Sequence, residues 1–253
     1  MRRSMTPRHP RRRQFLQYGL GIVAAGALVV PVRAQDIVDK TKQTLGLKAE
    51  DVTPPEDLMR EHGVLDRVLL IYEAAMRKFA ANEDFDPQVI TDSANVVKDF
   101  IEDYHERSEE QFLFPRFEKA NQLTDLVSTL LTQHQSGRLL TQRILQHAPK
   151  SRSDGDDRRQ AVDAMQAFIR MYRPHAARED TVLFPKLREI VSGHEFDSIG
   201  EDMEKQEQQK FGQDGFEKMA AHVAEIEKRI GIADLNQFTP VLTPPPGTQG
   251  RGG

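Results

Sequence analysis

The sequence predicts an all-α protein, a four-helix bundle followed by an additional C-terminal helical segment. Apolar residues recur every three or four positions between residues 53 and 191, and no stretch sustains the alternation of a strand. A His-x-x-x-Glu motif with a Leu-Phe-Pro tail occurs twice, as HERSEEQFLFP at 105–115 and HAAREDTVLFP at 175–185. The two copies align residue by residue. A repeat of this kind predicts two similar helical hairpins, which together make a bundle with pseudo-twofold symmetry.

The first helix is predicted to begin at Thr53, because Thr-Pro-Pro-Glu supplies a capping threonine, prolines in the first turn and a glutamate three residues on. Its apolar positions step alternately by four and three residues, which is typical of one seam facing a partner helix. A histidine interrupts this seam, which consists of Leu58, His62, Leu65, Leu69, Tyr72, Met76 and Phe79.

Three further helices are predicted in the same way. The second begins at Asp86-Pro87, the third covers about 122–147, and the fourth runs from about 157 after a break at Gly155. Each has a histidine on its apolar face, namely His105, His134 and His175. The bundle is therefore assigned to 53–191. A helical extension is assigned to 192–231, with a charged stretch and then an amphipathic segment near 214–230.

The two ends of the chain are predicted to lie outside the fold. Residues 1–34 combine seven arginines, an apolar run of 15 residues and a small-residue exit, which indicates a signal peptide too short to span a membrane comfortably. RRRQFLQ, with the pair Arg12-Arg13, resembles a twin-arginine export signal. We expect a periplasmic or secreted protein without stable membrane insertion after cleavage. Residues 35–52 are assigned as a linker and 232–253 as a flexible Pro/Gly-rich tail.

Composition narrows the chemistry. The chain has no cysteine, which excludes disulfides, thiolate metal sites and cysteine nucleophiles. Removal of residues 1–34 takes away seven positive charges and changes the formal net charge from -4 to -11. Such an acidic protein is not expected to bind nucleic acid or an anionic membrane. Any metal ion must be held by nitrogen and oxygen ligands.

The repeated motif predicts a buried metal site. Residues four apart share one helix face, so His105 with Glu109, and His175 with Glu179, each present an imidazole and a carboxylate inward. Each pair has a histidine on the preceding helix, His62 or His134. A single histidine on an apolar face is usually a core residue, but burying two unpaired carboxylates costs several kcal/mol unless a cation balances them. Six converging groups are enough for two metal ions bridged by carboxylates.

At these residues the chain resembles the hemerythrin family, specifically bacterial HHE cation-binding domains, over about 53–191. The resemblance implies an up-down-up-down four-helix bundle that holds two iron ions in a non-heme di-iron centre reacting with dioxygen. The ligands it implies are His62, His105, Glu109, His134, His175 and Glu179.

One position departs from the pattern of the family. Oxygen-carrying hemerythrins have His-x-x-x-His on the third helix, whereas this chain has Arg138 four residues after His134. Arginine stays protonated and cannot bind a metal. Glu106 is a candidate to supply the missing ligand, as an equivalent glutamate does in the iron-sensing branch of the family, and is predicted as a seventh site residue. The alternative is a solvated surface glutamate.

Several interpretations stay open at this point. A ferritin-like di-iron bundle would need Glu-x-x-His twice, and only Glu102-x-x-His105 occurs. Zinc or manganese would suit the ligand atoms but not the resemblance. The protein either binds or senses dioxygen or another small oxidant, or is an enzyme consuming peroxide, oxygen or nitric oxide, or handles iron without turnover.

Overall fold

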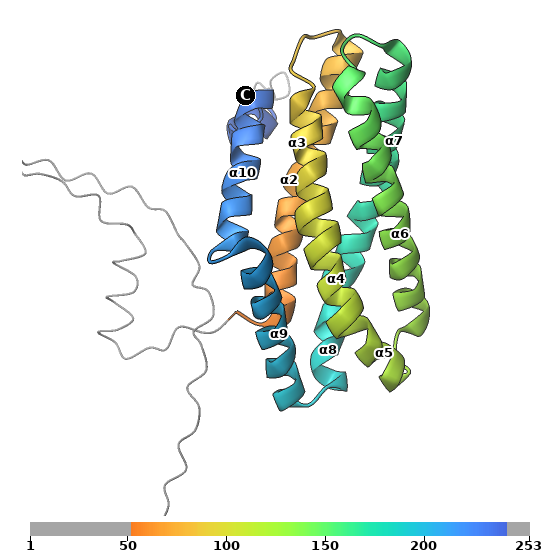
Figure 1. Ribbon diagram of the computed structural model, residues 1–253, viewed down its shortest axis with the longest axis vertical. Coiled ribbons are helices and arrows are strands. Elements are labelled where there is room, and N and C mark those ends of the chain that lie inside the picture. The colour runs from red at the N-terminus through yellow and green to blue at the C-terminus, as the bar shows by residue number, and fades with distance from the viewer. Residues whose placement is uncertain (1–51, 242–253) are drawn as a thin grey trace, which may run out of the picture.

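The computed structural model describes residues 52–241 and confirms the predicted fold (Figure 1). Four long helical segments form an up-down-up-down bundle, and no strand occurs among the described residues. The first segment is α2 (Pro54–Ala81) and the third is α6 (Thr124–His147). The second consists of α3 (Gln88–Val96), η1 (Val97–His105), α4 (Glu106–Ser108), η2 (Glu109–Leu113) and α5 (Phe114–Ala120). The fourth consists of α7 (Gly155–Arg178), η4 (Glu179–Leu183) and α8 (Phe184–Ile190).

The described range leaves out parts of three predicted segments. The signal peptide assigned to 1–34, residues 35–51 of the linker and residues 242–253 of the tail lie outside it. Between residues 52 and 241, no helix combines the length and the apolar composition needed to cross a membrane.

Local sequence signals set where the helices begin. The Glu56 carboxylate accepts a hydrogen bond of 2.8 Å from the backbone N–H of Thr53, as the predicted capping box requires. The Asp86 carboxylate likewise accepts from the backbone N–H of Gln88. The fourth segment begins at Gly155, two residues before the predicted start, because the Asp154 side chain caps it by accepting from the backbone N–H groups of Asp156 and Asp157.

The second and fourth segments contain π-helical turns that the sequence analysis did not predict. η1, η2 and η4 have this geometry, and η2 and η4 occupy equivalent places in the two hairpins. Each of these two begins at the glutamate of the His-x-x-x-Glu motif and ends just before the phenylalanine of the Leu-Phe-Pro tail. Short π turns inside α-helices are often found at functional sites.

The apolar core is divided into two clusters, and the motif histidines lie between them. Along α2, Leu58 belongs to one cluster and Leu65 to the other, with His62 between. The other segments repeat this order, with His105 between Tyr104 and Leu113, His134 between Leu130 and Ile144, and His175 between Tyr172 and Leu183. A polar layer therefore crosses the bundle, shielded by apolar side chains on both sides.

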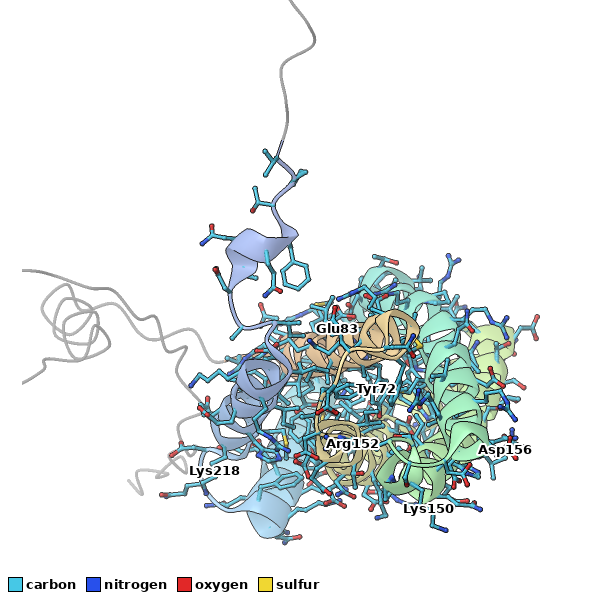
Figure 2. The ribbon with its side chains drawn as sticks, turned by 90° about the horizontal axis from the view of Figure 1, so that it is seen from above. Tyr72, Glu83, Lys150, Arg152, Asp156 and Lys218 are labelled. Carbon is cyan, nitrogen blue, oxygen red and sulfur yellow. The ribbon has the colours of Figure 1, made fainter. Side chains whose placement is uncertain are left out.

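The extension consists of two helices, α9 (Gly193–Phe211) and α10 (Gly215–Ile230) (Figure 1). α10 packs on α2 and α3, and α9 packs on α2 and on the second segment at η1 and η2. The charged stretch after the bundle is thus itself helical, and the prediction of a single amphipathic segment there was incomplete. Seen from above, Tyr72 lies inside the bundle whereas Lys218 lies on the outer side of the extension (Figure 2). Val223, Ile226 and Ile230 of α10 join the larger apolar cluster, so the extension completes the core.

Candidate metal centre

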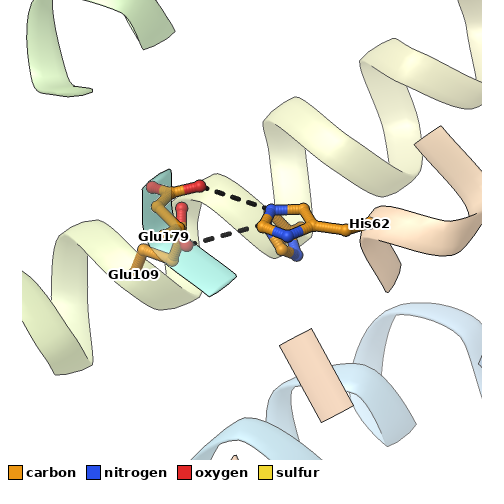
Figure 3. Close-up of side chains that lie close together, drawn as sticks. His62, Glu109 and Glu179 are labelled. Carbon is orange, nitrogen blue, oxygen red and sulfur yellow. Dashed lines mark ion pairs between the residues drawn. The ribbon is translucent and has the colours of Figure 1, made fainter. Parts of the chain in front are cut away.

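Two glutamates from equivalent positions of the hairpins meet in the polar layer. Glu109 begins η2 and Glu179 begins η4, and both side chains have no exposed surface. Figure 3 shows their carboxylates next to each other, facing the imidazole of His62. Two carboxylates side by side in an apolar interior repel each other and have lost their hydration. This arrangement therefore calls for a compensating positive charge.

Each of these glutamates faces the Nε2 atoms of two histidines. Glu179 meets His62 of α2 and His175 of its own segment, and Glu109 meets His105 of its own segment and His134 of α6. All four histidines are buried. The Nε2–oxygen distances are 3.3 Å for His62, 3.1 Å for His175, 3.6 Å for His105 and 3.4 Å for His134.

The other nitrogen of each ring donates a hydrogen bond to a side chain that the sequence analysis did not identify. Donation from Nδ1 leaves Nε2 as the unprotonated atom that can bind a metal, and it fixes the orientation of the ring. The acceptors are Asp180 for His62 (2.8 Å), Glu61 for His105 (2.8 Å), Glu110 for His134 (3.0 Å) and Gln133 for His175 (2.9 Å).

These four acceptors occupy equivalent positions in the sequences of the two hairpins, although the sequence does not show which histidine each one contacts. Glu61 and Gln133 each immediately precede the single histidine of a hairpin, and Glu110 and Asp180 each immediately follow the glutamate of a His-x-x-x-Glu motif. The signal is visible once the two hairpins are aligned. It is weak alone, because polar residues beside a ligand are common for other reasons.

The atoms in this layer fit a metal ion. None of the four oxygens of Glu109 and Glu179 has a hydrogen-bond partner among the described residues, and neither do the Nε2 atoms of His105 and His134. Buried polar atoms are nearly always satisfied, so six orphaned atoms in one layer call for an explanation. Potential ligand atoms of His62, His105, Glu109 and Glu179 lie within 4.8 Å of one another, as do those of His134, His175 and Glu179. Imidazole nitrogens and carboxylate oxygens suit iron, zinc and manganese.

The ionisation of the metal-free layer shows what a cation would replace. Burial and the neighbouring Glu179 hold the pKa of Glu109 well above its usual range. Burial also disfavours ionised Glu179, but His175 and His62 outweigh it and lower the pKa of Glu179. Burial disfavours protonated His62 as well, yet Asp180 and Glu179 raise the pKa of His62 to about 9. A proton on His62 therefore balances part of the negative charge at neutral pH, and a cation binding there has to displace it.

Glu106, the seventh predicted site residue, lies beside this layer with partners of its own. The side chain is buried, the Tyr172 hydroxyl donates to Oε1, and Oε2 lies 2.8 Å from a guanidinium nitrogen of Arg138. The same nitrogen lies 2.8 Å from Glu110. Burial raises the pKa of Glu106 to about 8 against the effects of Tyr172 and Arg138.

Glu106 therefore lies close to the histidine layer, but its contacts are with Tyr172 and Arg138. Potential ligand atoms of Glu106, Glu110 and His134 lie within 4.8 Å of one another, so a role as ligand stays a prediction. The Tyr172 hydroxyl reaches Glu106 because residue 137 is glycine. A Cβ atom there would overlap the hydroxyl oxygen.

A helical bundle with four histidines and two glutamates converging in a buried layer defines a class, the metal-binding four-helix bundles. The family model described as the hemerythrin HHE cation binding domain matches residues 53–187, and the chain belongs to this family. This match supports the resemblance seen in the sequence rather than a ferritin-like bundle. The family binds metal ions, typically iron.

The chain is also similar to three mycobacterial proteins. One comes from Mycobacterium bovis (strain ATCC BAA-935 / AF2122/97) and two from Mycobacterium tuberculosis, strains CDC 1551 / Oshkosh and ATCC 25618 / H37Rv. Each is 48% identical over 190 residues, which cover 75% of this chain and 74% of the relative, and each is named an uncharacterized protein. No solved structure matches this chain.

Proposed function

We propose that this hemerythrin-like protein holds a non-heme di-iron centre and reacts with or senses dioxygen or a related small oxidant. The observation that supports this most strongly is the pair of buried glutamates, whose four oxygens lack hydrogen bonds to the described residues and face four histidine Nε2 atoms. Two carboxylates and four imidazoles would give each of two ions an equal share of ligands. The ligands are His62, His105, Glu109, His134, His175 and Glu179.

Within this proposal, the side chains bind, orient and shield. Glu109 and Glu179 lie where they can bridge or chelate the two ions, and the four Nδ1 hydrogen bonds hold the imidazoles with Nε2 inward. The apolar clusters on both sides keep bulk water out of the layer. Iron at such a site supplies reversible one-electron chemistry and reactivity toward dioxygen.

The iron content of the mature chain tests the proposal. Residues 35–253, produced with adequate iron, are expected to contain about two iron atoms per chain, because the ligand set is sufficient for two ions. Elemental analysis gives the count. Stoichiometric zinc without iron would contradict the proposal.

The second step of this test asks which function the centre serves. Anaerobically reduced protein is mixed with air, and the formation and lifetime of a charge-transfer band are followed. Continued consumption of added peroxide or nitric oxide would instead favour an enzyme, and stable iron without any response to oxidants would favour iron handling.

We also propose that the protein acts outside the cytoplasm, in the periplasm or secreted, after folding and export through the twin-arginine route. Changing both Arg12 and Arg13 to lysine is expected to retain the precursor in the cytoplasm, because that route requires the arginine pair. The matched control changes Arg2 and Arg3 to lysine, which keeps the same charge and leaves the pair intact. Fractionation of cells expressing each precursor gives the result, and equal export of both variants would refute this assignment.

A further inference from the structure

The two Leu-Phe-Pro tails have no role in the ligand set, although they repeat as fully as the ligands do. After each central glutamate comes an acidic residue, Glu110 or Asp180, and five positions after the glutamate comes a phenylalanine, Phe114 or Phe184. The described structure places all four side chains against a histidine of the other hairpin.

The acidic residues reach across the bundle. Glu110, from the first hairpin, accepts the Nδ1 hydrogen bond of His134 in the second hairpin at 3.0 Å. Asp180, from the second hairpin, accepts that of His62 in the first at 2.8 Å. By contrast, His105 and His175, which belong to the His-x-x-x-Glu motifs, use acceptors from their own hairpins.

The phenylalanines cross in the same way. The ring of Phe114 stacks on His134 with centroids 5.5 Å apart and an interplanar angle of 24°. The ring of Phe184 stacks on His62 at 5.6 Å and 19°. Both phenylalanines are almost completely buried. Each of the two single histidines is thus held at its edge by a carboxylate and on its face by a ring, both from one segment of the opposite hairpin.

The acidic residue and the phenylalanine are four positions apart and so share a helix face, and the π turns set how the phenylalanine lies relative to the central glutamate. In an α-helix, residues five apart point in different directions, because one turn takes 3.6 residues. In η2 the Phe114 N–H bonds to the Glu109 carbonyl, and in η4 the Phe184 N–H bonds to that of Glu179, five residues back in each case. The wider turn brings the phenylalanine toward the face of the glutamate. Pro115 and Pro185, which follow, lack the N–H that would continue the α-helical pattern.

We propose that the acidic residue and the phenylalanine after each central glutamate together clamp the single histidine of the other hairpin. The two hairpins thus position each other's metal ligands. This inference rests on the proposed metal centre. Glu110 and Phe114 are positioning residues for His134, and Asp180 and Phe184 are positioning residues for His62. The clamp makes the metal site a property of the assembled bundle, because neither hairpin alone can orient all of its own histidines.

The experiment compares three leucine substitutions in the mature chain, F114L, F184L and the control F117L. Phe117 is fully buried in the same apolar cluster and follows Phe114 by one turn of α5, so its substitution removes similar packing without removing a ring from a histidine. Affinity for Fe(II) is measured anaerobically by competition with a chelator. F114L and F184L are expected to bind about tenfold or more weakly, the usual effect of losing a residue that orients a metal ligand. F117L is expected to keep the affinity of the unmodified protein, and equal affinities in all three variants would overturn the proposal.

A second readout does not depend on metal. In the metal-free protein, the imidazole nitrogen resonances are recorded, and F184L is expected to shift those of His62 while F114L shifts those of His134. The variant D180A, which alters a partly exposed residue and leaves the core intact, is expected to shift His62 as F184L does. Shifts confined to the hairpin that carries the substitution would overturn the clamp. Absence of iron from the unmodified protein, with the crossed shifts observed, would refute the proposed function and leave the clamp supported.

Discussion

Replacement of Glu109 or Glu179 by glutamine is expected to reduce the iron content from the proposed two atoms per chain to nearly none. Each glutamate faces two histidines, and its oxygens have no other partner among the described residues. Glutamine keeps the size of the side chain but has no charge, so it can neither bridge two cations nor balance them. If each glutamate binds both of the proposed ions, one substitution would remove both. Elemental analysis of E109Q and E179Q measures the effect.

Although E109Q is expected to lose iron, its metal-free form is not expected to lose stability. The pKa of Glu109 is held above its usual range by burial and by Glu179, so the folded protein carries a penalty for ionising it. Glutamine has a similar size and cannot ionise, so this penalty is absent from the variant. Metal-free E109Q is therefore expected to unfold at an equal or higher denaturant concentration than the unmodified metal-free protein.

The control for both measurements is E207Q. Glu207 is also buried, but it lies in α9 and accepts a hydrogen bond from the backbone N–H of Phe216, which glutamine can still accept. Its iron content is expected to stay unchanged. Full iron loading of E109Q and E179Q would show that the glutamates do not hold the metal.

The fold could be predicted because its main signals are local. The seam containing His62 and the capping residue Thr53 lie within one helix, where periodicity and caps act over a few residues. The π turns η2 and η4 could not be predicted, since they depend on a proline and on packing against another helix. α9 was hidden by its many charges, although Phe196, Ile199 and Met203 have helical spacing and are buried.

In the candidate site, too, contacts within one helix could be predicted and contacts between helices could not. Histidines and glutamates at i and i+4 share a face by geometry alone, so the pairing of His105 with Glu109 needs no knowledge of the fold. Contacts across the bundle depend on the relative height and rotation of two helices. Asp180 and His62 are separated by 118 positions, and Tyr172 and Glu106 by 66, so neither hydrogen bond follows from spacing.

Substitution of Arg138 is expected to have the second large effect, a loss of stability. Its guanidinium lies 2.8 Å from both Glu106 and Glu110, so it balances a buried carboxylate and also holds the acceptor of His134. Removing one partner of a buried ion pair costs about 3–5 kcal/mol, and partial exposure of Arg138 reduces this to about 2 kcal/mol. Because the pKa of Glu106 is raised to about 8, we expect R138M to destabilise the metal-free protein by that amount above pH 8, where the ionised Glu106 is left buried without its cation. Denaturant unfolding measures the loss.

A double-mutant cycle of R138M with E106Q tests whether Arg138 stabilises the protein by balancing the charge of Glu106. If Arg138 serves mainly to balance Glu106, the double variant E106Q/R138M is expected to recover most of the stability that R138M loses, because no unpaired charge remains. R138K is the matched control, which keeps the charge but replaces the planar guanidinium fork by a single ammonium. Strictly additive losses would show that the two residues act independently.

The iron content of the same variants assigns Glu106. Oε1 of Glu106 accepts a hydrogen bond from Tyr172 and Oε2 forms an ion pair with Arg138, so E106Q is expected to retain the proposed two iron atoms per chain. The reduced, iron-loaded R138M is expected to oxidise faster in air than the unmodified protein, because removing a positive charge near the metals favours the ferric state. Stopped-flow mixing with oxygen follows that rate. Loss of one iron atom from E106Q would instead make Glu106 a ligand, in the place left by Arg138 on the third helix.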